Sequence, residues 1–82
     1  MSFRTYELPP YHYAKKYCND LYDGKKRRVE DLGIKKLNKL RNGLLEHVLE
    51  IKGEQIWKAE YVNIVNNTLK EVENELFERQ IL

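Results

Sequence analysis

The side chains that could carry catalytic chemistry are few, and their spacing fits no reactive site. The chain has two histidines, His12 and His47, and one cysteine, Cys18. Neither histidine has a cysteine or carboxylate at a metal-ligand spacing, and Glu46 beside His47 does not form a Glu-x-x-His pair. No base is aimed at Cys18, so we expect a buried structural thiol. The sequence therefore predicts a protein that is not an enzyme and that holds no metal and no cofactor.

A run of basic side chains is the most pronounced local feature. Its members are Lys25, Lys26, Arg27, Arg28, Lys35, Lys36 and Lys39. A patch that contacts phosphates would bind with an affinity that falls steeply with salt. A solvated helix face with a charged turn is an equal alternative, and the patch could also meet an acidic protein surface. Base-reading side chains are sparse, so sequence-specific DNA recognition is not expected.

The tyrosines are gathered at the start of the chain. Those in the first 22 residues are Tyr6, Tyr11, Tyr13, Tyr17 and Tyr22. Tyrosine is enriched at protein interfaces, and we expect about half of these rings to pack inside and the rest to form a partner-binding surface. Base stacking by the same rings is a less favoured alternative.

The size and composition limit the kind of protein. The chain has 82 residues, of which 41% are hydrophobic and 34% charged, so we expect one globular domain with a thin core. Cys18 has no second cysteine to pair with, which indicates a reducing, intracellular (cytoplasmic) setting. We expect no signal peptide and no membrane span, because no apolar run is long enough.

Charge is distributed unevenly along the chain. Residues 1–41 hold 11 Lys and Arg against 5 Asp and Glu, and residues 42–82 hold 4 against 8. The net charges of the two halves are therefore +6 and −4. Such a small protein is expected to present one basic and one acidic surface, which bears on its partners rather than on its fold.

Helical periodicity and turn residues predict the elements that must position these side chains. An extended arm is expected over residues 1–8, followed by helices over about 10–22, 29–52 and 54–80. Pro9 and Pro10 suit the first turn of a helix, and Gly24 suits a left-handed cap after the first helix. Gly53 separates the second helix from the third. A very short connection there would make these two long helices antiparallel.

The apolar positions of the two long helices form matching stripes. The second helix is expected to bury Leu37, Leu40, Leu44, Val48 and Ile51, with Leu45 and Leu49 widening the stripe. The third is expected to bury Trp57, Tyr61, Ile64, Val65, Thr68, Leu69, Val72, Leu76 and Phe77. The predicted fold is all-α, with a short N-terminal helix packed on an antiparallel hairpin of two long helices.

One glycine weakens this prediction for the second helix. Gly43 follows Asn42 in the middle of the expected helix, where glycine costs about 1 kcal/mol relative to alanine. The apolar period continues in phase across it, which favours one helix. A break at residues 41–43 is the alternative, and it would divide the long helix into two.

Two stretches resemble known families of replication proteins. Leu8-Pro9-Pro10-Tyr11-His12-Tyr13, followed by Leu37, Leu40, Arg41 and Leu44 and then Glu60-Tyr61, resembles the helical domain of the GINS family. That family's small β domain has no counterpart here. Size, helicity and charge resemble the small helical accessory subunits of the crenarchaeal B-family replicative DNA polymerase. This second resemblance implies an archaeal, non-catalytic subunit that clamps onto the polymerase and modulates DNA handling.

The sequence thus gives two hypotheses of different kinds. The first is a protein-interaction module, an accessory subunit of a DNA replication complex that binds a larger protein such as a DNA polymerase. The second is a small nucleic-acid-binding regulator that uses the basic residues. A heptad-like seam of this length could also pair with another copy, so a homodimer is a further possibility.

Overall fold

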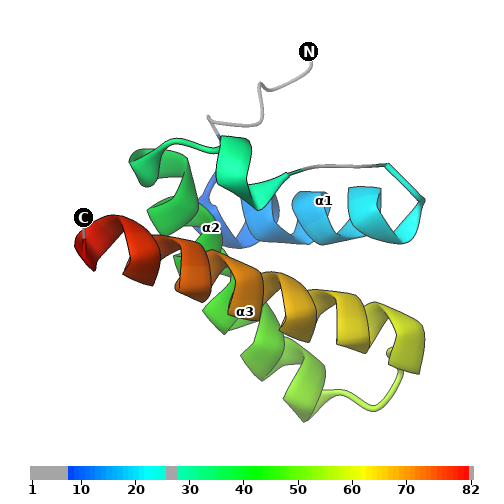
Figure 1. Ribbon diagram of the computed structural model, residues 1–82. Coiled ribbons are helices and arrows are strands. Elements are labelled where there is room, and N and C mark those ends of the chain that lie inside the picture. Colours follow the sequence, from blue (N-terminus) through cyan, green and yellow to red (C-terminus); the bar gives the residue numbers. More distant parts are fainter. Residues whose placement is uncertain (1–7, 26–27, 82) are drawn as a thin grey trace.

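The computed structural model describes residues 8–25 and 28–81, and this part of the chain is helical with no strand (Figure 1). The elements are α1 (Pro10–Tyr22), a single 3-10 turn η2 (Val29–Asp31), α2 (Ile34–Gly53) and α3 (Ala59–Ile81). The predicted all-α class is therefore confirmed for the described residues. None of the helices in those residues has the length and apolar character of a membrane span.

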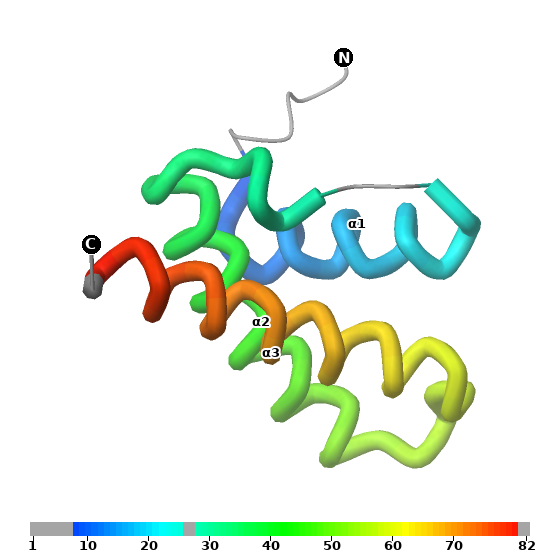
Figure 2. Tube along the Cα trace, viewed as in Figure 1, coloured from blue at the N-terminus to red at the C-terminus, as the bar shows by residue number. Residues whose placement is uncertain are grey.

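The three α-helices all contact one another. α1 packs on α2 and on α3, and α2 packs on α3. Figure 2 shows α3 running back across α2 after the connecting loop, with α1 lying along the same side of the molecule as the 3-10 turn. A short helix placed on an antiparallel hairpin is compatible with these contacts.

The core lies where the three helices meet. Its apolar members are Tyr13, Ala14, Tyr17 and Cys18 from α1, Leu37, Leu40 and Leu44 from α2, Tyr61, Val65, Val72 and Leu76 from α3, and Val29. Half of the side chains expected in the two stripes are buried, and five more are half-buried against the core: Val48, Ile51, Trp57, Ile64 and Leu69. Phe77 is an error of the prediction, since it is 63% exposed. Leu45 and Leu49 extend the α2 stripe onto the surface, where they are 41% and 69% exposed.

Gly43 is the point at which α1 and α2 come closest. α2 runs unbroken through this residue, so the predicted alternative of a break at residues 41–43 is wrong. A Cβ atom at Gly43 would overlap the Pro10 carbonyl oxygen and lie 2.8 Å from the Ala14 Cβ. The glycine therefore permits a backbone approach that no larger residue allows, which offsets its low helix propensity.

The second helix begins later than the sequence predicts. Instead of helix from residue 29, the chain makes the η2 turn, then an extended residue Leu32, and α2 begins at Ile34. The reason lies on α3. The Arg79 guanidinium donates to the carbonyl oxygens of Leu32 at 2.7 Å and Glu30 at 2.9 Å, which holds this segment in a non-helical path.

The third helix also begins later, at Ala59 rather than at residue 54. Residues 54–58 form a loop, which is longer than the one- or two-residue connection expected. Within this loop Trp57 folds back onto the first turn of α3 and stacks on Tyr61, with ring centroids 5.2 Å apart. Packing of this large ring outweighs the helical propensity of the segment.

We expect Gly43→Ala to lower the free energy of unfolding by about 2 kcal/mol or more, because overpacking outweighs the gain in helix propensity. Denaturant unfolding followed by circular dichroism measures this. Gly53→Ala is the matched control, since nothing lies within 4 Å of a Cβ atom there. It should change stability by no more than about 0.5 kcal/mol. Equal losses in the two variants would contradict a close contact at Gly43.

We expect Arg79→Lys to loosen the segment before α2, because lysine keeps the charge but lacks the forked donors. The amides of Asp31 and Leu32, which donate to the carbonyls of Arg28 and Val29, should exchange faster with deuterium. Stability should fall by about 1 kcal/mol. Glu75→Gln is the control, since it removes only the ion pair with Arg79 and leaves both carbonyl contacts. Unchanged exchange in Arg79→Lys would show that another group holds this segment.

Candidate functional site

A buried polar network joins all three helices around His47. This side chain on α2 is fully buried, and its Nε2 lies 2.7 Å from the Tyr61 hydroxyl on α3. Its Nδ1 lies 3.2 Å from Oε1 of Glu50, one turn further along α2. From α1, the Tyr11 hydroxyl donates a hydrogen bond to the other oxygen of the same carboxylate. Tyr11 of α1 and His47 of α2 thus both face the carboxylate of Glu50.

The geometry fits a neutral His47 whose proton is on Nδ1. In that tautomer Tyr61 donates to Nε2, and Nδ1–H faces the Glu50 carboxylate. Burial lowers the pKa of His47, the Glu50 carboxylate opposes this by raising the pKa, and the Lys15 ammonium lowers it further. Burial, and next the hydrogen bond to Glu50, raises the pKa of Tyr11 to about 12. At neutral pH the network therefore consists of one carboxylate and neutral partners.

Two members of this network are closed off from solvent in the described conformation. His47 has no exposed surface, and Tyr61 is 5% exposed. Cys18 is buried as expected, and burial raises the pKa of its thiol to about 12, so the thiolate needed for nucleophilic chemistry is not formed at neutral pH. Among the described residues no group of three or more side chains is placed to hold a metal ion.

Aromatic rings continue outward from the network. Trp57 stacks on Tyr61 and meets the His47 ring edge-on at 5.4 Å. The Lys15 ammonium lies 5.6 Å from the centre of the Trp57 ring and 5.9 Å from that of Tyr11, within the range of a cation–π contact. Tyr22, at the end of α1, packs edge-on against Tyr61 at 5.8 Å. The rings of Trp57 and Tyr22 are thus held in place by their contacts with the Tyr61 ring.

The outer side of these rings opens into a hollow of about 230 Å³. The residues that line it, called here the aromatic hollow, are Asn19, Tyr22, Ile56, Trp57, Lys58 and Tyr61. Ile56 is 82% exposed and Tyr22 is 37% exposed, so apolar surface is available around a concave site. Trp and Tyr are the side chains most enriched among those that dominate binding at protein interfaces.

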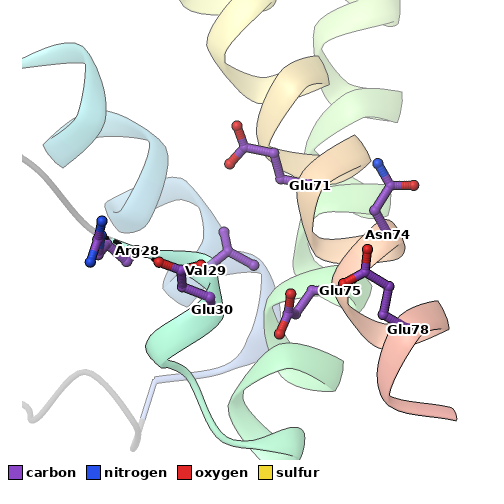
Figure 3. Close-up of a pocket in the computed structure, with 7 residues that line it drawn as sticks. All are labelled: Arg28, Val29, Glu30, Glu71, Asn74, Glu75 and Glu78. Carbon is purple, nitrogen blue, oxygen red and sulfur yellow. Dashed lines mark ion pairs between the residues drawn. The ribbon is translucent and has the colours of Figure 1, made fainter. Parts of the chain in front are cut away.

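A second hollow, of about 380 Å³, lies between α3 and the segment before α2. Its lining is mainly charged, and consists of Arg28, Val29, Glu30, Glu71, Asn74, Glu75 and Glu78. Figure 3 shows the α3 carboxylates across from Arg28 and Glu30, which form an ion pair at 3.4 Å. A neighbouring hollow of about 490 Å³ shares Arg28 and Glu71 and adds Leu21 and Ile64. The exposed charges here have both signs, and this lining contains no exposed aromatic anchor.

The described members of the predicted basic patch do not all lie in one place. Lys25 lies 3.8 Å from Asp20, and the Lys39 ammonium lies over the Tyr13 ring at 5.5 Å. Lys35 and Lys36 are exposed on the first turn of α2. Figure 2 shows that α2 starts near the beginning of α1, whereas Lys25 comes shortly after the end of α1. Lys25 therefore lies at the opposite end of α1 from Lys35 and Lys36. Lys26 and Arg27 fall outside the described residues.

The predicted tyrosine surface is reduced by packing. Tyr13 and Tyr17 are 2% and 1% exposed, so these rings are part of the core and cannot contact a partner in this conformation. Tyr11 is half-buried and bound to Glu50, and Tyr22 remains exposed. Tyr6 falls outside the described residues.

The sequence prediction missed the loop residues of the aromatic hollow. The sequence patterns assign no role to Ile56, and they predict that Trp57 lies in the seam of the third helix. The available signal is the adjacent pair of large apolar residues Ile56 and Trp57, which begins three residues after Gly53 at the end of α2. His47 was examined only as a metal ligand or base, because its partners Tyr11 and Tyr61 are distant in the sequence.

Comparison with known proteins gives no relative. No protein-family model, no curated protein and no solved structure matches this chain. The resemblances to GINS proteins and to polymerase accessory subunits are therefore untested, and the geometry of the described residues carries the functional argument.

We expect acid to destabilise the fold through His47. Because its pKa is lower in the folded than in the unfolded chain, the unfolded chain binds more protons below about pH 6.5. The His47 contribution to stability is therefore complete above pH 6.5 and is lost as the pH falls below it. Unfolding of the protein and of His47→Gln between pH 8 and 4.5 measures this.

The His47→Gln variant should show a smaller loss of stability on acidification than the unmodified protein. A nuclear magnetic resonance titration gives the protonation of His47 directly, and the exposed His12 supplies a second ring signal in the same spectra. Protonation of His47 at or above pH 6.5 would contradict the expectation.

Proposed function

We propose that this protein is a non-catalytic interaction module that binds a larger protein through the aromatic hollow. The observation that carries the proposal is the exposure of Ile56 and Tyr22 around a concave site floored by Trp57. An exposed aliphatic side chain beside two aromatic rings is the kind of surface on which binding energy concentrates.

The buried network supports this proposal because it holds the hollow in shape. Trp57 is stacked on Tyr61, and Tyr61 is in turn hydrogen-bonded to His47 in the core. A site whose rings are already fixed loses little conformational entropy when a partner binds. The network would then contribute to partner binding by holding the rings of the aromatic hollow in position.

The burial of the reactive side chains supports a non-catalytic role. His47 and Cys18 are the described side chains best suited to acid–base or nucleophilic chemistry and have no exposed surface. His12 is exposed, and it forms no hydrogen bond or ion pair with an acidic or basic side chain among the described residues. Neither His47 nor Cys18 lines the hollow between α3 and the segment before α2, its neighbour, or the aromatic hollow.

The narrower form of the proposal is an accessory subunit of a DNA replication complex, with a DNA polymerase as the larger protein. The sequence resemblance to polymerase accessory subunits supports it, together with the all-helical fold. The direct nucleic-acid-binding alternative is supported by Lys35 and Lys36, which are exposed and make no ion pair with another described residue.

We expect Ile56→Glu to weaken partner binding at least tenfold, because the exposed anchor would be replaced by a charge. The partner is first recovered on the immobilised protein from source cells and identified by mass spectrometry. Its affinity for each variant is then measured by calorimetry. Leu49→Glu is the matched control, since it places the same charge at another exposed aliphatic position that lies outside the hollow.

Photo-crosslinking gives an independent measure of the contact. A photoreactive residue at position 56 should label the partner, and one at position 36, on the basic turn of α2, should not. Equal labelling from both positions would overturn the aromatic hollow as the contact surface. Binding of duplex DNA at physiological salt that is lost in Lys35→Ala/Lys36→Ala would favour the nucleic-acid alternative.

A further inference from the structure

The large apolar side chains that remain exposed fall into two groups. Tyr22 and Ile56 belong to the aromatic hollow. The others are Ile34, Leu45 and Leu49 on α2 and Phe77 on α3, with exposed fractions of 47%, 41%, 69% and 63%. These four account for most of the large apolar side chains left open to solvent in the described chain, and the proposed function does not use them.

The second group lies on one face of the molecule. Ile34, Leu45 and Leu49 follow one another at helical spacing, and Arg41 falls between them at the same spacing, so all four share one stripe of α2. Phe77 and Arg41 line the same hollow of about 210 Å³ between α2 and α3. This face, called here the outer face, is on the side of α2 away from Gly43 and therefore away from α1.

The outer face also carries charges of opposite sign on its two helices. Arg41 on α2 and Glu73 on α3 border the hollow beside Phe77, and neither makes an ion pair with another described residue. Lys52, two helical turns beyond Leu45, adds a second positive charge to the α2 edge. The α2 edge of this face is thus basic, and the adjoining α3 edge contains Glu73.

We propose that the outer face is the interface of a two-fold homodimer in which α2 of one copy packs on α3 of the other. A two-fold interface must be self-complementary, and this face holds both halves of a complementary pair on adjacent helices. In this arrangement Arg41 meets Glu73 of the partner subunit. Packing of α2 on α2 would instead bring the basic edges together.

The shape of the face suits a second copy. From Ile34 to Leu49 the stripe runs about 22 Å along α2, with Asn38 and Arg41 between its apolar members Ile34 and Leu45, and Phe77 lies beside Arg41. The seam expected to pair copies contained Leu37, Leu40 and Leu44, and these side chains are fully buried within one chain. A dimer must therefore use a different stripe of α2, and the outer face is the apolar one that remains.

Sedimentation equilibrium of the full chain at low salt tests the interface. We expect a concentration-dependent dimer, which Leu49→Glu should weaken at least tenfold because it places a charge in the apolar stripe. Ile56→Glu is the matched control, since it makes the same kind of change in the aromatic hollow and should leave dimerisation unchanged. Circular dichroism verifies that both variants fold.

A charge exchange tests the arrangement of the helices. Arg41→Glu and Glu73→Arg should each weaken the dimer several-fold, because each variant alone opposes like charges across the interface. An equimolar mixture of the two variants should recover dimerisation, since each chain then meets the opposite charge on the other. A salt bridge formed within one chain would not be restored by mixing.

Two results would overturn the proposal. A protein that stays monomeric throughout the concentration range has no such interface. A dimer that resists Leu49→Glu, or that is strengthened by Arg41→Glu, uses another face or pairs α2 with α2. Loss of partner binding in Ile56→Glu with an intact dimer would separate this inference from the proposed function.

Discussion

The contact between Gly43 of α2 and Pro10 of α1 is the constraint on which the described structure depends. The two backbones approach so closely that a methyl group at Gly43 would overlap the Pro10 carbonyl. This approach fixes where the first turns of α1 lie along α2. As a result Tyr11 reaches Glu50 and Lys15 reaches the Trp57 ring. Gly43 thus determines how the side chains around His47 are arranged, although it contributes no side chain to them.

The buried network follows from that approach and explains the shape of the α2–α3 loop. A buried imidazole is costly unless its nitrogens have partners: Nε2 is hydrogen-bonded to the Tyr61 hydroxyl, and Nδ1 lies 3.2 Å from the Glu50 carboxylate without an aligned hydrogen bond. The rings of Trp57 and Tyr11 meet His47 edge-on and close it off from solvent. The loop must therefore be long enough to bring Trp57 back over Tyr61. The same ring that closes the core forms the floor of the aromatic hollow, so core packing and the proposed recognition site share one residue.

The exposed surface divides into two apolar sites with different surroundings. The aromatic hollow lies at the end of α1 and contains Lys58 as its charged residue. The outer face lies away from α1 and has charges of both signs, Arg41 and Glu73, at its edges. This separation allows one small chain to bind a partner with one surface and a second copy with the other. α1 affects both sites. It supplies Tyr22 to the aromatic hollow, and it does not cover the outer face of α2.

Local patterns in the sequence determined the helical class, the bounds of α1, the burial of Cys18 and most of the core, because these depend on the spacing of neighbouring residues. The starts of α2 and α3 were decided by tertiary contacts, those of Arg79 with the Glu30 and Leu32 carbonyls and of Trp57 with Tyr61. The same holds for the role of Gly43, whose cost in a helix is visible in sequence but whose neighbour Pro10 is not. Which tyrosines were buried and which stayed exposed was likewise decided by the packing of α1. Pairing of residues far apart in the chain has no local signal, and for that reason the His47 network and the aromatic hollow emerged only from the tertiary structure.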